Sequence, residues 1–156
     1  MMLIQRLQQT TPRKIMLLPR LLAGVPMVFF GAMHFMNPQH LRDILTASGV
    51  PMVDVNVWAA SSAEVLGGIL LLTGFFARVG GILGIGTMAP AILATVRMAG
   101  LPDAPKVPPL PLPIVVVVAS AVVLVLGGGA WSADAHRQGA NFPAGPRAFH
   151  VPGPTK

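Results

Sequence analysis

The stretch that decides the fold is residues 55–76, VNVWAASSAEVLGGILLLTGFF, in which Glu64 is the one charged residue. A helix that spans a bilayer needs about 20 predominantly apolar residues, and this stretch is long enough. Removing an ionised carboxylate from water costs several kcal/mol or more unless a partner pairs with it or a proton neutralises it. The stretch therefore predicts a membrane-spanning helix with a buried carboxyl group that needs a partner.

The composition of the whole chain also indicates a membrane protein. Its 156 residues are 53% hydrophobic and only 10% charged, whereas soluble domains average about 25% charged residues. The chain has no cysteine, which excludes disulfides, thiolate metal sites, Fe–S clusters and thiol redox chemistry of its own. The net charge of +6 comes from scattered basic residues. We therefore expect contact with anionic lipid headgroups and no binding of nucleic acid.

Three further segments are long and apolar enough to cross a bilayer. The four expected spans are residues 15–36, 55–76, 79–99 and 113–131. Eight basic residues lie on the side of both termini and three on the other side, so both termini are expected in the cytoplasm. The sequence thus predicts an all-α, integral membrane four-helix bundle in residues 1–131, with the longer outer connections at 37–54 and 100–112.

Residues 132–156 differ from the spans in composition. They are rich in Gly, Pro and Ala and have no apolar periodicity, so we expect an extended cytoplasmic tail that does not fold alone. Such a tail gains order by lying across another protein. Besides membrane lipids, the expected partners are therefore other subunits of a membrane protein complex, contacted by helix faces and by this tail.

Two side chains of the first span are candidate partners for Glu64. At about 100° per residue, Arg20 and His34 share one stripe of the helix, with Arg20 towards the cytoplasmic end and His34 towards the outer end. An Arg20–Glu64 pair would best offset the desolvation of the carboxylate. The alternatives are that Arg20 snorkels to the headgroups, that His34 bonds at the outer interface, and that Glu64 is protonated or bonded to Ser61 or Thr87.

Small residues predict where the helices touch. Glycines four residues apart in the third span, and an Ala-xxx-Gly pair in the second, let backbones approach closely. A ligand groove is the alternative to packing at these faces. The structural and packing residues expected from these patterns are Gly67, Gly68, Gly80, Gly84 and, in the turn after the second span, Arg78.

His34 is the one histidine near the expected membrane core, and a bis-His haem needs two at matched depth on facing helices. No metal site and no intrinsic cofactor are therefore predicted. A single pigment or metal on His34 is an alternative that we do not expect.

Several short motifs follow the order seen in a known family. The first span reads RLLAG at 20–24 and FGAMHF at 30–35, GVP follows at 49–51, and the second span reads AEVLGGILLLTG at 63–74. Over about residues 15–100 the chain resembles the DoxX-like family of small four-helix bacterial membrane proteins. The resemblance implies a multi-pass protein of the bacterial cytoplasmic (inner) membrane. Arg20, Glu64 and Arg78 match the family's polar positions, whereas His34 stands where many relatives have a lysine.

The resemblance also implies a link to membrane redox chemistry, because some relatives are subunits of quinone-linked oxidoreductases, including a thiosulfate:quinone enzyme. We expect an accessory or structural subunit of a bacterial redox or energy-converting complex, respiratory or photosynthetic, that is not catalytic alone. One alternative is a quinone- or quinol-binding subunit in which Arg20 or His34 bonds a quinone carbonyl and Glu64 relays a proton. A further alternative is a small proton-coupled carrier or lipid-binding protein that uses Glu64.

Overall fold

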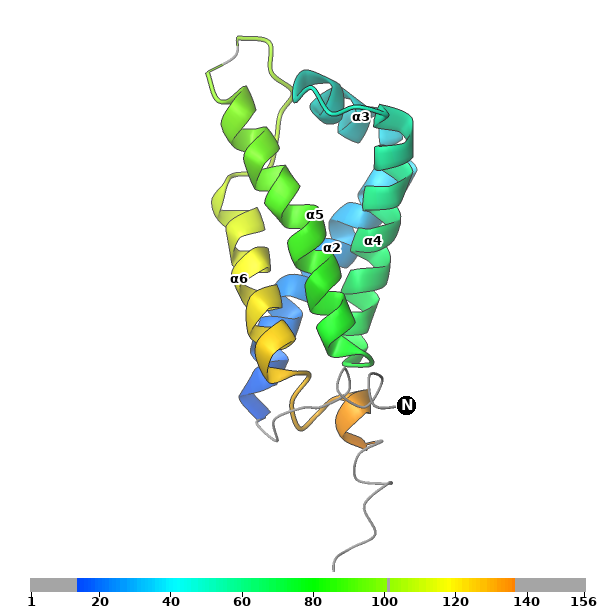
Figure 1. Ribbon diagram of the computed structural model, residues 1–156, viewed down its shortest axis with the longest axis vertical. Helices are drawn as coiled ribbons and strands as arrows, with labels where there is room; N and C mark the ends of the chain where they lie inside the picture. Colours follow the sequence, from blue (N-terminus) through cyan, green and yellow to red (C-terminus); the bar gives the residue numbers. More distant parts are fainter. Residues whose placement is uncertain (1–13, 101, 137–156) are drawn as a thin grey trace, which may run out of the picture.

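Four helices run side by side in the computed structural model, which describes residues 14–100 and 102–136. They are α2 (Leu17–Met36), α4 (Val53–Thr73), α5 (Ala77–Met98) and α6 (Pro111–Leu126), and a short 3-10 turn, η1 (Lys14–Met16), leads into α2. A fifth, short helix, α3 (Pro38–Ala47), lies across one end of the bundle (Figure 1). The predicted all-α four-helix bundle is confirmed, and the cytoplasmic placement of both termini stays a prediction.

Three of the helices are long and apolar enough to cross a membrane: α2 together with η1, α4, and α5. The expected fourth span, 113–131, is wrong at its end, because α6 stops at Leu126 and Gly127 adopts a left-handed φ of 80°. With 16 residues, α6 is about 24 Å long, less than the roughly 30 Å of a hydrocarbon core.

Helix α3 occupies part of the segment expected to be a plain connection. Pro38 stands at its first turn, where a missing N–H does no harm, and Leu41 and Ile44 form its buried face. Ile44 clusters with Ala94 and Met98 of α5. The apolar side of α3 therefore covers the end of the bundle, which we call the α3 end; the opposite end, with the tight α4–α5 turn at 74–76, is the turn end.

Glycines set the distance between neighbouring helices. A Cβ built on Gly68 of α4 would lie 2.9 Å from the carbonyl oxygen of Gly24 in α2. A Cβ on Gly80 of α5 would lie 3.0 Å from the carbonyl oxygen of Gly67 in α4, and one on Gly84 would collide with the Ser120 hydroxyl of α6. These positions have no room for a side chain, so the glycines lie where backbones approach most closely.

Residues that follow α6 close the turn end. The Asp134 carboxylate accepts hydrogen bonds from the backbone N–H groups of Phe76 (3.0 Å) and Ala77 (3.1 Å) at the start of α5. Ser132 and Asp134 are each 1% exposed. Residues 132–136, expected to begin the tail, thus pack against the bundle. Residues 1–13 and 137–156, which include most of that tail, lie outside the described residues.

Candidate functional site

Glu64, in the middle of α4, pairs with His34, in the last turn of α2. His34 Nδ1 of α2 lies 2.8 Å from Glu64 Oε2 of α4, and the two side chains are 12% and 7% exposed. Gly31, one turn before His34, makes the pair possible because a Cβ there would meet the Glu64 Cβ at 2.9 Å. The missing side chain lets α4 approach α2 closely, so the carboxylate reaches the imidazole.

The expected pair between Arg20 and Glu64 is therefore wrong. Arg20 lies towards the turn end, where its Nε donates to the Leu71 carbonyl at 2.7 Å and its Nη2 donates to the Leu72 carbonyl. Its Nη1 donates to the carbonyls of Gly128 (3.1 Å) and Trp131 (2.8 Å). The last turn of a helix leaves carbonyls without partners, and the guanidinium satisfies those of α4.

Arg20, Ser61 and Thr87 each have hydrogen-bond partners other than Glu64. Arg20 is 2% exposed, so it does not snorkel out of the bundle. Ser61 and Thr87 donate to carbonyls one turn back in their own helices, at 2.8 and 3.0 Å, and do not bond Glu64. Arg78 donates from Nη2 to the carbonyl of Val125 in α6 at 3.2 Å.

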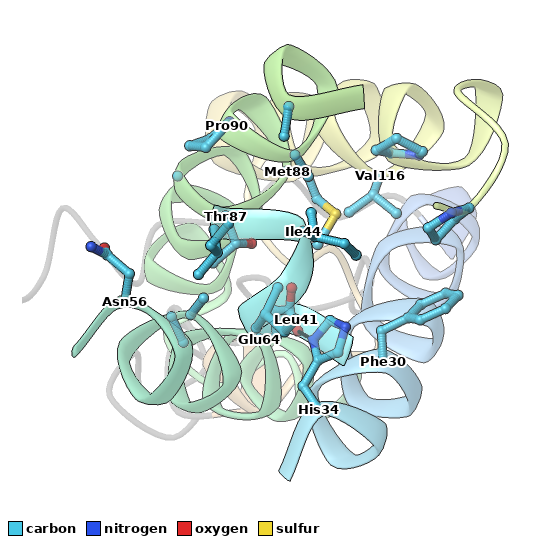
Figure 2. Close-up of a pocket in the computed structure, with 18 of the residues that line it drawn as sticks. Phe30, His34, Leu41, Ile44, Asn56, Glu64, Thr87, Met88, Pro90 and Val116 are labelled. Atoms are coloured by element: carbon cyan, nitrogen blue, oxygen red, sulfur yellow. Dashed lines mark hydrogen bonds and ion pairs between the residues drawn. The ribbon is translucent and has the colours of Figure 1, made fainter. Parts of the chain in front are cut away.

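A cavity of about 490 Å³ lies beside the His34–Glu64 pair, on its α3 side (Figure 2). All five helices line it, and the segment before α6 contributes Val107 and Pro108. Most of the lining is aliphatic or aromatic; labelled examples in Figure 2 are Phe30, Leu41, Ile44, Met88 and Val116. A large apolar chamber with a small number of polar groups in its wall is the usual form of a small-molecule site.

The pair keeps hydrogen-bonding capacity for a ligand. Within the part of the chain that the structure describes, Nδ1 of His34 and Oε2 of Glu64 make the one hydrogen bond of these two side chains. Each side chain has one more polar atom, His34 Nε2 and Glu64 Oε1. Neither of these two atoms is fully enclosed by protein without a hydrogen-bond partner. Because both residues line the cavity, a molecule inside it can reach these atoms.

The structure brings two of the three expected ligand residues together and places the third elsewhere. His34 and Glu64 line the cavity, and Arg20 does not. Within residues 14–100 and 102–136, no three His, Asp or Glu side chains are grouped so that they could hold a metal ion. The site is therefore a largely apolar cavity with one acid–imidazole pair. The other polar side chains in its wall are His40, Asn56, Thr87 and Thr95.

Comparison with known proteins identifies the family. The family model described as DoxX matches residues 15–98, more than half of the chain and the part that carries both members of the pair. A search of curated proteins gives no match, and a search of solved structures gives none. The order of the helices and the matched residues lead to one conclusion: this chain is a membrane protein of the DoxX family.

Proposed function

We propose that this protein binds a quinone or quinol in the cavity and serves as the quinone-binding membrane subunit of an oxidoreductase. The observation that carries the proposal is the His34–Glu64 pair in the wall of a largely apolar chamber of about 490 Å³. A quinone has matching chemistry, because its flat ring is apolar and its carbonyl oxygens accept hydrogen bonds. The cavity is within the range of about 300–1,000 Å³ that is typical of small-molecule sites.

The pair can give a proton to a bound oxygen. When it holds its full complement of protons, as imidazolium with carboxylate or as imidazole with carboxylic acid, His34 Nε2 carries a hydrogen that can face a ligand. Transfer of that proton leaves an Nδ1–H that donates to a Glu64 carboxylate. The carboxylate thereby selects the Nδ1–H tautomer, and the pair passes one proton per cycle.

Electrons must come from another protein. The chain has no cysteine for an iron–sulfur centre, so we assign the electron carrier (a flavin, haem or iron–sulfur centre) and the proton for the second quinone oxygen to a partner subunit. This proposal gives a specific form to the broader expectation of an accessory subunit in a redox complex.

The decisive experiment is a quinone titration of the purified protein in lipid nanodiscs. Wild type should bind a short-tailed benzoquinone with a saturable isotherm, and His34→Leu should raise the Kd at least about tenfold, because it removes the hydrogen-bond donor to the carbonyl. The matched control is His136→Leu at the exposed turn end, which should leave the Kd within about twofold of wild type.

Two results would contradict the proposal. One is the absence of saturable quinone binding to wild type. The other is an equal Kd for His34→Leu and His136→Leu. If fatty acids or phospholipids saturate the wild-type site and quinones do not, the lipid-binding alternative replaces the quinone assignment.

A further inference from the structure

The cavity reaches the surface of the bundle at the seam between α4 and α5. Among the residues that line it in the described part of the chain, nearly all are buried or half-buried. The exposed ones all belong to α4 and α5: Ala59, Ile82, Gly86 and Pro90. A residue that both lines a chamber and lies exposed marks its mouth, so the chamber opens between α4 and α5.

The two helices are close at the turn end and separate towards the α3 end (Figure 1). A Cβ on Gly67 would lie 2.9 Å from the Leu83 Cβ, which marks tight packing. About one turn further along α5, a Cβ on Gly86 would meet nothing within 4 Å. Pro90 follows in the same helix, where it removes a backbone donor and favours a kink. The seam is therefore closed at Gly67 and open at Gly86.

Larger side chains line the other sides of the chamber. Phe30 and Met33 of α2 and Leu112 of α6 line it and are half-buried. Leu41 and Ile44 of α3 are buried over the end of the bundle. By contrast, the rim of the α4–α5 opening includes Ala59 and Gly86, which leave space between the two helices.

The opening lies at the depth of the hydrocarbon layer. Gly86 is nine residues after the start of α5 at Ala77, or about 14 Å along a helix of about 33 Å. Ala59 is six residues, about 9 Å, inside the end of α4 at Val53. Lipid chains rather than water therefore stand in front of the opening when the bundle spans a membrane.

We propose that this opening, the α4–α5 portal (Ala59, Ile82, Gly86 and Pro90), admits the ligand sideways from the bilayer and holds its long apolar tail. The inference rests on the proposed function and narrows it to a membrane-dissolved quinone with an isoprenoid or alkyl tail. The ring lies beside His34 and Glu64, and the tail leaves between α4 and α5.

Two probes test this route: a dimethoxy-methyl-benzoquinone without a tail, and the same ring with a decyl tail. The portal variant is Gly86→Leu, whose new Cβ has open space. In nanodiscs it should raise the Kd of the tailed probe at least about tenfold and change that of the tailless probe less than about twofold. The matched control, Ala89→Leu, is exposed on the same helix but does not line the cavity, and should alter neither Kd.

The outcomes separate the portal from the site itself. If neither probe binds wild type, the proposed function fails. If both probes bind wild type and Gly86→Leu leaves the tailed Kd unchanged, the portal is wrong and the site stands. An equal loss of both probes in Gly86→Leu also overturns the portal, because the new side chain would then act inside the chamber.

A second measurement does not depend on the bulk of leucine. The chain has no native cysteine, so Gly86→Cys and Ala89→Cys can each carry one nitroxide label. The label at 86 should collide frequently with oxygen, as a lipid-facing site does, and the tailed quinone should reduce that collision rate by half or more. The label at 89 should not respond. If a saturating concentration of the tailed quinone leaves the oxygen collision rate of the label at 86 unchanged, the portal proposal is wrong.

Discussion

Replacing Arg20 by methionine should destabilise the bundle more than any other single charge removal in the described residues. The guanidinium, 2% exposed, donates to four carbonyls at 2.5–3.1 Å, two in the last turn of α4 and two in the segment after α6. Methionine fills a similar volume but donates no hydrogen bond, so all four carbonyls lose this donor.

The magnitude follows from these contacts. Hydrogen bonds that involve a charged group contribute about 1.5–3 kcal/mol each, which gives an upper limit of about 6–12 kcal/mol for four. The desolvation of the guanidinium opposes this gain, and breaking a buried charged network typically costs about 3–5 kcal/mol. We therefore expect Arg20→Met to lower the free energy of unfolding by about 3–5 kcal/mol. Arg20→Lys should lose less, because it keeps the charge but not the planar fork that serves several carbonyls at once.

The assay is reversible unfolding in mixed micelles of a mild detergent and SDS, followed by far-ultraviolet circular dichroism. The matched control is Arg97→Met, in the last turn of α5, where the arginine is exposed. It should change the unfolding free energy by no more than about 0.5 kcal/mol. If Arg20→Met and Arg97→Met unfold at the same SDS fraction, Arg20 does not hold the turn end together and the assignment is refuted.

Other substitutions test the rest of the framework in the same assay. Asp134→Ala removes the carboxylate that caps α5 and should cost about 1–2 kcal/mol; no loss would argue against the cap. Gly31→Leu forces a side chain into the backbone contact between α2 and Glu64 and should lower the free energy of unfolding by about 1–3 kcal/mol. Its control, Gly86→Ala, should leave that free energy unchanged. Equal effects of the two substitutions would contradict the close approach of the helices at Gly31. Arg42→Ala breaks an exposed ion pair and should cost less than about 1 kcal/mol, and a larger loss would show that this pair matters more than its exposure implies.

Much of the fold could be predicted from the sequence because lipid imposes a simple length rule. Long, predominantly apolar runs predict the second and third spans to within three residues of α4 and α5. The predicted end of the fourth span lies beyond the end of α6 at Leu126, because the sequence stays apolar past Gly127 whereas the backbone turns there. Helix α3 was missed because it is too short for a span, although the spacing of Leu41 and Ile44 is a helical signal.

The site could be predicted in part. Glu64 is visible as a lone charge in an apolar run, and helix periodicity put Arg20 and His34 on the face that meets it. Choosing between them by charge was wrong, because the carbonyls at the end of α4 compete for the guanidinium. Gly31, one turn from His34, indicates that α2 approaches Glu64 most closely near its His34 end and not near Arg20. Nothing local predicts the role of Asp134, which acts across 58 positions of sequence.

The account depends on a ligand lying in the α3 half of the bundle against the His34–Glu64 pair. The most direct measurement is photolabelling in nanodiscs with an azido-substituted, tailed quinone, followed by mass spectrometry of the labelled peptides. The account predicts label on Phe30, Met33, Thr87 or Met88, all of which line the chamber, and loss of that label when excess unmodified quinone is present. Label confined to the turn end or to the lipid-facing side of α6, or label that unmodified quinone does not displace, would contradict it.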